Sequence, residues 1–564
     1  MNSKGFSGIQ KLIALSVIAL VALIAASQFA HGDASGTSTG TAVNATTYSG
    51  NGGTAFSDTC STATTTDDLN NCAKNEPGAV LDAVGHVKIA TNFTWLLIMG
   101  AFVLFMQAGF ALLTTGLTRA KNAGHMMMLN FAAFVIAWIA YFAVGFAFQF
   151  GGTALNAAPA NLAGASVLSD LAKAGGNHWG LIGLHGFFLQ SGHSYDVSAL
   201  ALFFFEVVFM ETAGYIIVGA IAERINFKTF ILAELAVGGI IYPIYGCWLW
   251  GGGWLSQIGN SWGLGHGAVD FAGSGVVHAV GGWTALALAV LLGPRIGKFN
   301  ANGKPNAIPG HNIPYVVIGT FILLFGWMGF NPGSTLGSSD LRISVIIENT
   351  ATASVFGAAA AMAYTAFVYG KPDISMSCNG MLAGLVAITA PCAFVAPYAA
   401  AIIGLVAGVL VCVSVWFWDN IAHVDDPCGA VSVHAVNGAW GVLALGLFAD
   451  GTYGAGWNGV TGNVSGLFYG DAGQLGAQAI SVVVAFAWAF GVTMVLFGLY
   501  KMVSSIRVAP EVEVIGLDVP EFGVAGYSGF VMERELHGSI PAELIAQALA
   551  SQSKPVLEPG SASA

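Results

Sequence analysis

The sequence predicts an all-α polytopic membrane protein with 11 transmembrane helices, arranged as two inverted five-helix repeats plus a final helix, N-out/C-in. The first observation is composition: the 564 residues are 55% hydrophobic and only 8% charged, with a mean hydropathy of +0.72. A soluble protein of this length needs more charge to cover its surface. The second is that the apolar stretches are continuous and not alternating, which favours helices over a β-barrel. The third is a short motif that occurs twice.

Residues 1–32 are predicted to be a secretory signal peptide. Lys4 and Lys11 precede the apolar run 12–26, and small residues follow at 30–32, which is the order of features in such a peptide. The alternative is an uncleaved first helix, which is less favoured because the run is short for a membrane span.

Residues 33–88 are predicted to be an exported polar segment, rich in Ser, Thr, Gly, Asn and Asp. Cys60 and Cys72 lie in it and can form a disulfide if the segment is exported, although nothing in the sequence decides between paired and free thiols. No Cys or His spacing typical of a zinc or redox site occurs in the chain, so we expect no metal and no cofactor.

The transmembrane domain is expected over residues 89–502, followed by a cytoplasmic C-terminal tail at 503–564. Each apolar stretch is long enough, or nearly so, to cross a hydrocarbon core of about 30 Å. The predicted spans are 93–117, 125–149, 198–222, 229–250, 272–293, 313–335, 346–369, 380–397, 399–418, 431–449 and 477–501.

The distribution of Lys and Arg sets the expected orientation. With the mature N-terminus outside, twelve of the 18 Lys and Arg residues fall in cytoplasmic loops and the tail, and four fall in outer loops. The net charge of −11 argues against a nucleic-acid partner, which needs clustered basic residues. We therefore expect a multi-pass protein of the plasma (inner) membrane, with the lipid bilayer as its surroundings.

The repeated motif occupies residues 270–280, DFAGSGVVHAV, and 426–436, DPCGAVSVHAV. Both copies fit the pattern Asp-x-x-Gly-x-x-x-Val-His-Ala-Val. The first copy begins the fifth predicted helix from outside, and the second begins the tenth from inside. Because five is odd, two five-helix halves must have opposite orientations, which is the inverted-repeat architecture of many transporters.

His278 and His434 are the predicted centre of the protein. Each lies eight residues after the Asp of its motif, so each enters about 12 Å from its own membrane face and the two imidazoles can meet near the midplane. One buried His is usually only hydrogen-bonded to a neighbour. Two at equivalent positions of a repeat favour a pathway, because ionisable groups are rare in a bilayer core.

Asp270 and Asp426 begin the two copies of the motif. An acidic side chain at a helix N-terminus accepts hydrogen bonds from free backbone N–H groups, so capping is the expected role of both residues. Asp270 can also shape a cation site on the outer side of its helix.

These motifs resemble those of the ammonium transporter family (the Amt, Mep and Rh proteins), over about residues 90–527. The resemblance implies a homotrimer with one pore per subunit, an outer cation site, a pair of stacked phenylalanines and a narrow apolar pore lined by the two histidines. The matching motifs are DFAGSGVVHAVGGWTALALAVLLGPR at 270–295, TGLTRAKN at 115–122, GAIAERI at 219–225, GWMGFNPGS at 326–334, VDDPCGAVSVH at 424–434 and EVEVIGLDVPEFGVAGY at 511–527.

The resemblance also implies roles for residues that composition alone does not single out. The alternative for each aromatic residue is ordinary packing, since the chain has 37 Phe residues. The implied roles are the gate for Phe209 and Phe330, ammonium recruitment for Trp250 and Ser334, and pore lining for Trp327 and Leu323.

Glu206 is a departure from the family, which usually has Gln three residues before the first gate Phe. Our hypothesis is that Glu206 adds negative charge to the recruitment site. The carboxylate could equally trap the cation, or carry a proton and act as an amide mimic. Glu211, further along the same helix, has no assigned role.

The expected function is ammonium transport, with deprotonation at the aromatic gate and net electrogenic uptake through separate ammonia and proton movement. The alternatives are an electroneutral ammonia channel and an ammonium sensor with little flux. An enzyme is not expected, because no nucleophile and base accompany the histidines. A PII-type signalling protein is the regulator implied at the cytoplasmic face, although Phe522 stands where the family commonly has His.

Overall fold

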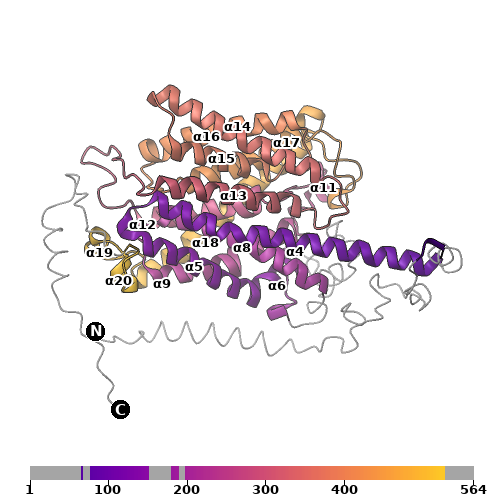
Figure 1. Ribbon diagram of the computed structural model, residues 1–564, viewed down its shortest axis with the longest axis horizontal. Helices are drawn as coiled ribbons and strands as arrows, with labels where there is room; N and C mark the ends of the chain where they lie inside the picture. Colours follow the sequence, from indigo (N-terminus) through magenta and orange to yellow (C-terminus); the bar gives the residue numbers. More distant parts are fainter. Residues whose placement is uncertain (1–64, 68–76, 152–179, 190–196, 528–564) are drawn as a thin grey trace, which may run out of the picture.

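The computed structural model describes residues 65–67, 77–151, 180–189 and 197–527, which form an all-helical bundle (Figure 1). Apart from isolated β-bridges, these residues contain no strand. The predicted signal peptide, the pair Cys60 and Cys72, and the last part of the tail lie outside the described residues.

Ten helices in the described residues are long and apolar enough to cross a membrane. Five of them contain a short π-helical segment, labelled η. In chain order they are α4 (Pro77–Leu117); α5 (Ala123–Ala140), η2 (Tyr141–Gly145) and α6 (Phe146–Phe150); α8 (Val197–Ile221); α9 (Phe227–Ala236), η6 (Val237–Ile241) and α10 (Tyr242–Leu249); η7 (Ser274–Ala279) and α12 (Val280–Leu292); α13 (Ile313–Gly333); α14 (Ile343–Tyr369); α16 (Pro397–Phe417) and η8 (Trp418–Ala422); η9 (Val431–Val436) and α17 (Asn437–Phe448); and α18 (Ala472–Val503).

Two predicted spans differ from the observed helices. The span predicted at 380–397 is the shorter helix α15 (Ile374–Ile388), of 15 residues. Pro391 explains its end, because proline has no backbone N–H and disfavours helical backbone at the residue before it. The span predicted from residue 93 begins at Pro77 instead, as α4. The helix extends beyond the apolar stretch from which it was predicted, because backbone hydrogen bonds in a helix do not require apolar side chains.

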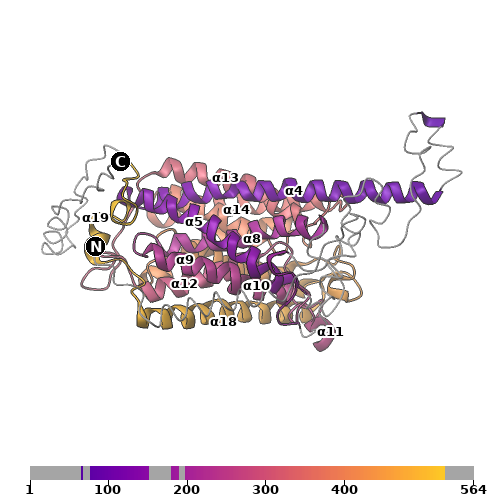
Figure 2. The same ribbon diagram turned by 90° about the horizontal axis from the view of Figure 1, so that it is seen from below.

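The long helices run side by side along one direction, and the two ends of the bundle are distinct (Figures 1 and 2). α4 packs along α13, and α14 packs against α15 and α16. The short helices α19 (Pro510–Ile515) and α20 (Asp518–Phe522) lie at one end, which we call the tail end. The short helix α11 (Ile258–Trp262) lies at the opposite end.

The two copies of the repeated motif cross at small residues in the core. A Cβ atom on Gly282 of α12 would lie 2.3 Å from the backbone nitrogen of Ala435. A Cβ atom on Gly438 of α17 would lie 2.9 Å from the backbone nitrogen of Ala279. Each glycine thus contacts the residue that follows the histidine of the other copy. From the first contact to the second, the residue number falls from 282 to 279 in one segment and rises from 435 to 438 in the other. The two segments are therefore antiparallel and related by an approximate two-fold axis.

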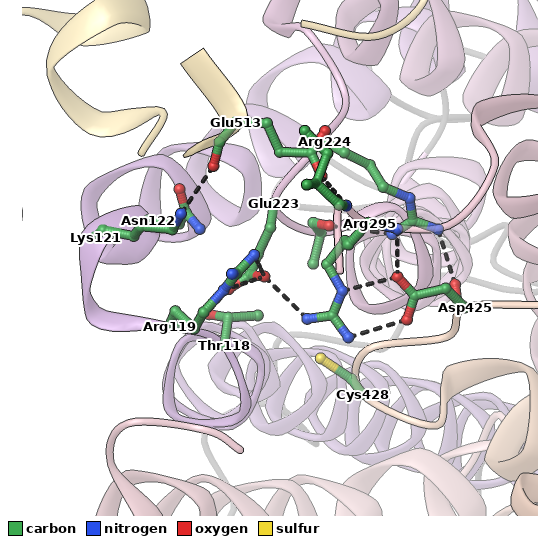
Figure 3. Close-up of polar contacts among 12 residues, drawn as sticks. Thr118, Arg119, Lys121, Asn122, Glu223, Arg224, Arg295, Asp425, Cys428 and Glu513 are labelled. Atoms are coloured by element: carbon green, nitrogen blue, oxygen red, sulfur yellow. Dashed lines mark hydrogen bonds and ion pairs between the residues drawn. The ribbon is translucent and has the colours of Figure 1, made fainter. Parts of the chain in front are cut away.

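A buried ion-pair network joins four loops at the tail end (Figure 3). Arg295 contacts Asp425 at 2.8 Å and Glu223 at 2.9 Å, and Arg119 contacts the same oxygen of Glu223 at 2.7 Å. The guanidinium of Arg224 donates to the carbonyl of Asp425 at 2.8 Å. These contacts join the segments that follow α4, α8, α12 and η8.

The charges in this network hold both acids in the ionised form. Burial alone would raise the pKa of Glu223, but the charges of Arg119 and Arg295 and hydrogen bonds from Arg119 keep that pKa well below its usual value. At Asp425, too, burial acts to raise the pKa. The charges of Arg295 and Arg224 outweigh burial and lower that pKa. The stability that both acids contribute is therefore complete above their unfolded pKa of about 4 and is lost as the pH falls through the folded pKa.

The C-terminal segment docks onto the same end of the bundle. Lys121 donates to the backbone carbonyls of Glu513 and Val514 at 2.8 and 2.7 Å (Figure 3). The carboxylate of Asp518 accepts from the N–H groups of Gly124 and His125, at the start of α5, at 3.0 and 2.8 Å. An acidic side chain at the N-terminus of a helix is favourably placed, so these contacts anchor α19 and α20.

Replacing Gly282 by Ala is expected to destabilise the bundle. The added methyl group would lie 2.3 Å from a backbone nitrogen, and forced overpacking costs about 1–3 kcal/mol. Gly498→Ala in α18 is the matched control, because a methyl group there meets nothing within 4 Å and Ala favours the helix. Thermal unfolding in detergent measures both variants. An unchanged Tm for Gly282→Ala would contradict the close crossing.

Replacing Arg295 by Ala is expected to cost about 3–5 kcal/mol, because two buried carboxylates lose their shared cation. Lys304→Ala, in an exposed loop, is the control and should leave the Tm unchanged. The same unfolding measurement, repeated between pH 4 and pH 8, checks the result. Equal Tm values for the two variants at neutral pH would show that the network is not a stabilising unit.

Candidate functional site

The imidazoles of His278 and His434 meet inside the bundle. Their Nδ1 atoms lie 3.3 Å apart and their ring centroids 5.3 Å apart. The residues are only 0% and 5% exposed. One ring must donate and the other accept in such a contact, so the pair holds one proton between them. Nε2 of His278 has no hydrogen-bond partner in the part of the chain that the structure describes.

Asp270 positions the first histidine segment. Its Oδ1 accepts from the N–H of Gly273, and its Oδ2 accepts from the N–H groups of Gly275 and Val276, all at 2.8–2.9 Å. Gly273 has a φ of 111°, in the left-handed region that favours glycine. The carboxylate thus caps the first turn of η7. This turn begins at Ser274, four residues before His278.

Asp426 makes the equivalent contacts in the second segment. It accepts from the N–H groups of Ala430 and Val431 at 3.0 and 2.7 Å. Burial raises the pKa of Asp426 to about 6, and the two N–H donors act in the opposite direction. Both motifs therefore start from an acid that accepts the free N–H groups of a π-helical turn.

Two phenylalanines lie stacked next to the histidine pair. Phe209 of α8 and Phe330 of α13 have ring centroids 3.8 Å apart and ring planes 24° apart. Phe330 also stacks on His278, with centroids 5.6 Å apart. The two phenylalanines are 1% and 0% exposed, so both rings are fully buried beside the histidines.

Trp250 and Ser334 contact the two stacked phenylalanines. The indole of Trp250 is 6.1 Å from the ring of Phe209, edge to face, and its N–H donates to the carbonyl of Asp270 at 2.7 Å. The hydroxyl of Ser334 donates to the carbonyl of Phe330 at 2.9 Å. Both residues are half-buried, whereas the phenylalanines are fully buried.

Trp327 and Leu323 both lie on α13, and the contacts place Trp327 at the side of the column. The indole of Trp327 stacks on His278 with centroids 5.1 Å apart, and its N–H donates to the hydroxyl of Thr389 at 3.0 Å. Leu323 is fully buried, and its side chain lies against Gly109 of α4. The structure thus brings Trp250, the two phenylalanines, Trp327 and the two histidines into one continuous column of rings.

Glu206 lies in a buried hydrogen-bonded chain that sequence reasoning did not predict. Tyr141 donates to the Oε1 of Gln149 at 2.7 Å, and Nε2 of Gln149 donates to Glu206 at 3.1 Å. All three residues are buried, and the donors are directed toward the carboxyl group. A glutamine at the end of the apolar run 125–149 was the signal that could have found this chain, because a polar side chain in a membrane span needs a partner.

The column consists of aromatic side chains and the two imidazoles, which carry its titratable nitrogens. Among the described residues, no group of three or more His, Cys, Asp and Glu side chains could hold a metal ion. Such a site can attract a cation to ring faces, exclude water from a closed gate and share a proton between two imidazoles.

The comparisons with known proteins identify the family of the chain. Residues 94–527 match the model of the Ammonium Transporter Family. The chain is 48% identical, over 79% of its length and 90% of the relative's, to Ammonium transporter Amt2 of Archaeoglobus fulgidus. It is 34% identical to Ammonium transporter Amt1 of Haloferax mediterranei, over 78% of this chain and 80% of that protein.

Solved structures show the same fold. A protein described as "Sensor Amt Protein" superposes with a TM-score of 0.67 at 36% identity, covering 78% of this chain and 99% of that one. Mep2 of Candida albicans superposes with a TM-score of 0.62 at 26% identity, covering 74% of this chain and 86% of that one. The chain therefore belongs to the ammonium transporter family, a family of membrane transporters and not of enzymes.

Proposed function

We propose that this protein transports ammonium across the plasma membrane through a narrow apolar pore centred on His278 and His434. The observation that carries the proposal is the continuous column of rings from Trp250 through the stacked phenylalanines to the imidazole pair. No other arrangement among the described residues combines a cation-attracting entrance, a closed gate and a proton-sharing centre.

The entrance recruits the ammonium cation. A charge inside hydrocarbon-like surroundings costs from about 3 to more than 10 kcal/mol, depending on the estimate. The faces of Trp250 and Phe209 offset part of that cost by cation–π attraction of about 1–2 kcal/mol. Ser334 accepts an N–H bond, and Asp270 adds negative charge nearby. Metal cations of similar size have no N–H to donate, so the site prefers ammonium.

Deprotonation occurs at the gate formed by Phe209 and Phe330. The rings beyond it solvate a neutral molecule better than a cation, so ammonium loses its proton before ammonia passes Trp327 and Leu323. The proton moves separately through the Nδ1 contact between His278 and His434, where one imidazole donates as the other accepts. Ammonia plus a proton amount to net ammonium, so uptake carries charge.

The proposed topology has eleven transmembrane helices in two inverted five-helix repeats plus a final helix, with the N-terminus outside. The antiparallel crossing at Gly282 and Gly438 supports the inversion. The basic loops around Arg119, Arg224 and Arg295 share the tail end with α19 and α20, which supports its placement in the cytoplasm. A short α15 counts as the eighth span, completed by residues 389–395.

We further propose a homotrimer, as the family resemblance implies, with a PII-type protein as regulator at the tail end. Phe522, which replaces the His common in the family, packs against the rings of His125 and Phe227 at 5.7 and 5.1 Å. The ring of Phe522 holds α20 onto α5 but cannot itself take up a proton, so regulation at this point differs from relatives that carry His.

An electroneutral ammonia channel is the nearest alternative mechanism, because the same column would pass ammonia without a proton. An ammonium sensor is the alternative from another class. It is favoured by one observation: a solved structure similar to this chain is described as a sensor. A sensor would bind ammonium at Trp250 and Ser334 and move α19 and α20, with little flux.

The proposed relay predicts a current when purified protein in proteoliposomes meets an ammonium jump. His278→Ala and His434→Ala should each reduce that current at least about tenfold, since a barrier raised by about 1.4 kcal/mol already has that effect. His423→Ala, an exposed histidine outside the column, is the control and should match the wild type. Uptake without any wild-type current would refute the relay and favour the ammonia channel. Binding without uptake would favour the sensor.

Glu206→Gln is expected to weaken uptake at low ammonium and to leave it unchanged at saturation. The substitution removes a carboxylate near the entrance but keeps an acceptor for Gln149, so folding should survive. Uptake measured over a range of ammonium concentrations checks this, with Glu348→Gln, an exposed carboxylate, as the control. An apparent affinity equal to that of the wild type would mean that Glu206 adds no recruiting charge.

A further inference from the structure

A second group of ionisable side chains lies inside the bundle, outside the proposed pore. Glu211 of α8 and Glu234 of α9 are 1% and 0% exposed. The side chain of Glu234 lies against α8, because a Cβ atom on Gly214 would be within 2.4 Å of its Oε2. Gly214 is one helical turn from Glu211, so the two carboxyl groups face each other and repel electrostatically.

Most of the oxygens in this pair have no partner. Gln107 of α4 donates to Oε2 of Glu211 at 3.3 Å. Oε1 of Glu211 and both oxygens of Glu234 are buried without a hydrogen bond. Two facing carboxylates, removed from water and without a cation, cannot both be ionised. At least one proton must therefore reside on the pair.

Tyr215 supplies an independent observation that points to the same place. It is 2% exposed, and its hydroxyl has no hydrogen-bond partner. That hydroxyl interacts electrostatically with both carboxyl groups. Its ring stacks on Phe110 with centroids 5.5 Å apart, and Phe110 lies 6.4 Å from the ring of His434. One phenyl ring therefore separates the tyrosine beside the carboxyl pair from the histidine pair.

The helices α8 and α9 that carry the pair hold one basic residue, Lys228, which is exposed near the start of α9. α5 and α12 pack against α8 and contain no Lys, Arg, Asp or Glu. α5 carries His125 in its first turn, and the part of α4 at 90–117 has no charged residue. The charge of the carboxyl pair is thus set by its own protons, and Tyr215 and Phe110 lie between the pair and His434.

We propose that Glu211 and Glu234 form a proton-sharing carboxyl pair whose release of one proton balances the charge when the histidine pair carries a proton. When the carboxyl pair loses its proton, it becomes one charge more negative, and that charge stabilises a positively charged imidazole across Phe110. Tyr215 donates its hydroxyl to the ionised carboxylate. This role rests on the proposed relay and adds a counter-charge that the column itself does not contain.

The first test asks whether the pair holds a proton, without measuring transport. Infrared spectra of the purified protein, recorded from pH 5 to pH 9, report protonated carboxyl groups by their C=O stretch. Glu211→Gln and Glu234→Gln should each remove or shift one such band, whereas Glu348→Gln, an exposed carboxyl, should not. Thermal unfolding of each variant shows that it is folded. A wild type without a protonated band, or a band unaffected by both substitutions, would overturn the proposal.

The second test asks whether the pair acts on the relay. In the ammonium-jump experiment, loss of the negative charge in Glu211→Gln or Glu234→Gln makes a proton on the imidazoles less favourable. The pH of half-maximal current should therefore shift to lower pH by about one unit or more, the size of effect that a single nearby charge produces. An unshifted profile in variants that lack the infrared band would overturn the link to the relay. An absent wild-type current would instead refute the proposed function, and the infrared result would stand apart from it.

Discussion

The antiparallel crossing of the two histidine segments is the constraint on which the rest of the structure depends. Each segment starts from an aspartate whose oxygens accept the free N–H groups of a π-helical turn, and each crosses the other at a glycine. Because glycine has no side chain, the two backbones approach closely enough for the Nδ1 atoms to come within 3.3 Å. A larger residue at either crossing would separate the imidazoles.

The same crossing also positions the far end of the column. Asp270 holds the turn of η7 with its side chain and the indole of Trp250 with its carbonyl. One residue therefore links the segment that carries His278 to the entrance of the proposed pore. The stacked rings of Phe209 and Phe330 contact both Trp250 and His278, so the proposed entrance, the proposed gate and the imidazole pair form one packed unit.

Charge is distributed unevenly in the bundle, and the reason is the cost of desolvation. At the tail end, Glu223 and Asp425 are buried but each is matched by arginine. Inside the bundle, Glu206 has an amide partner, whereas Glu234 has none. A carboxyl group that is neither paired nor solvated lowers stability, and Glu211 and Glu234 both have buried oxygens of this kind.

The sequence by itself determined the class of protein, ten of the predicted membrane helices and the two-fold relation between the histidines, because long apolar runs and a repeated motif are local patterns. Hydrophobicity did not reveal where α4 begins or where α15 ends, because a helix can extend beyond an apolar run, as α4 does, or end inside one, as α15 does before Pro391. Tertiary structure decided which rings stack, that Gln149 pairs with Glu206, and that Glu234 faces Glu211. Those contacts join residues from different helices, and the spacing along one helix carries no information about its neighbour.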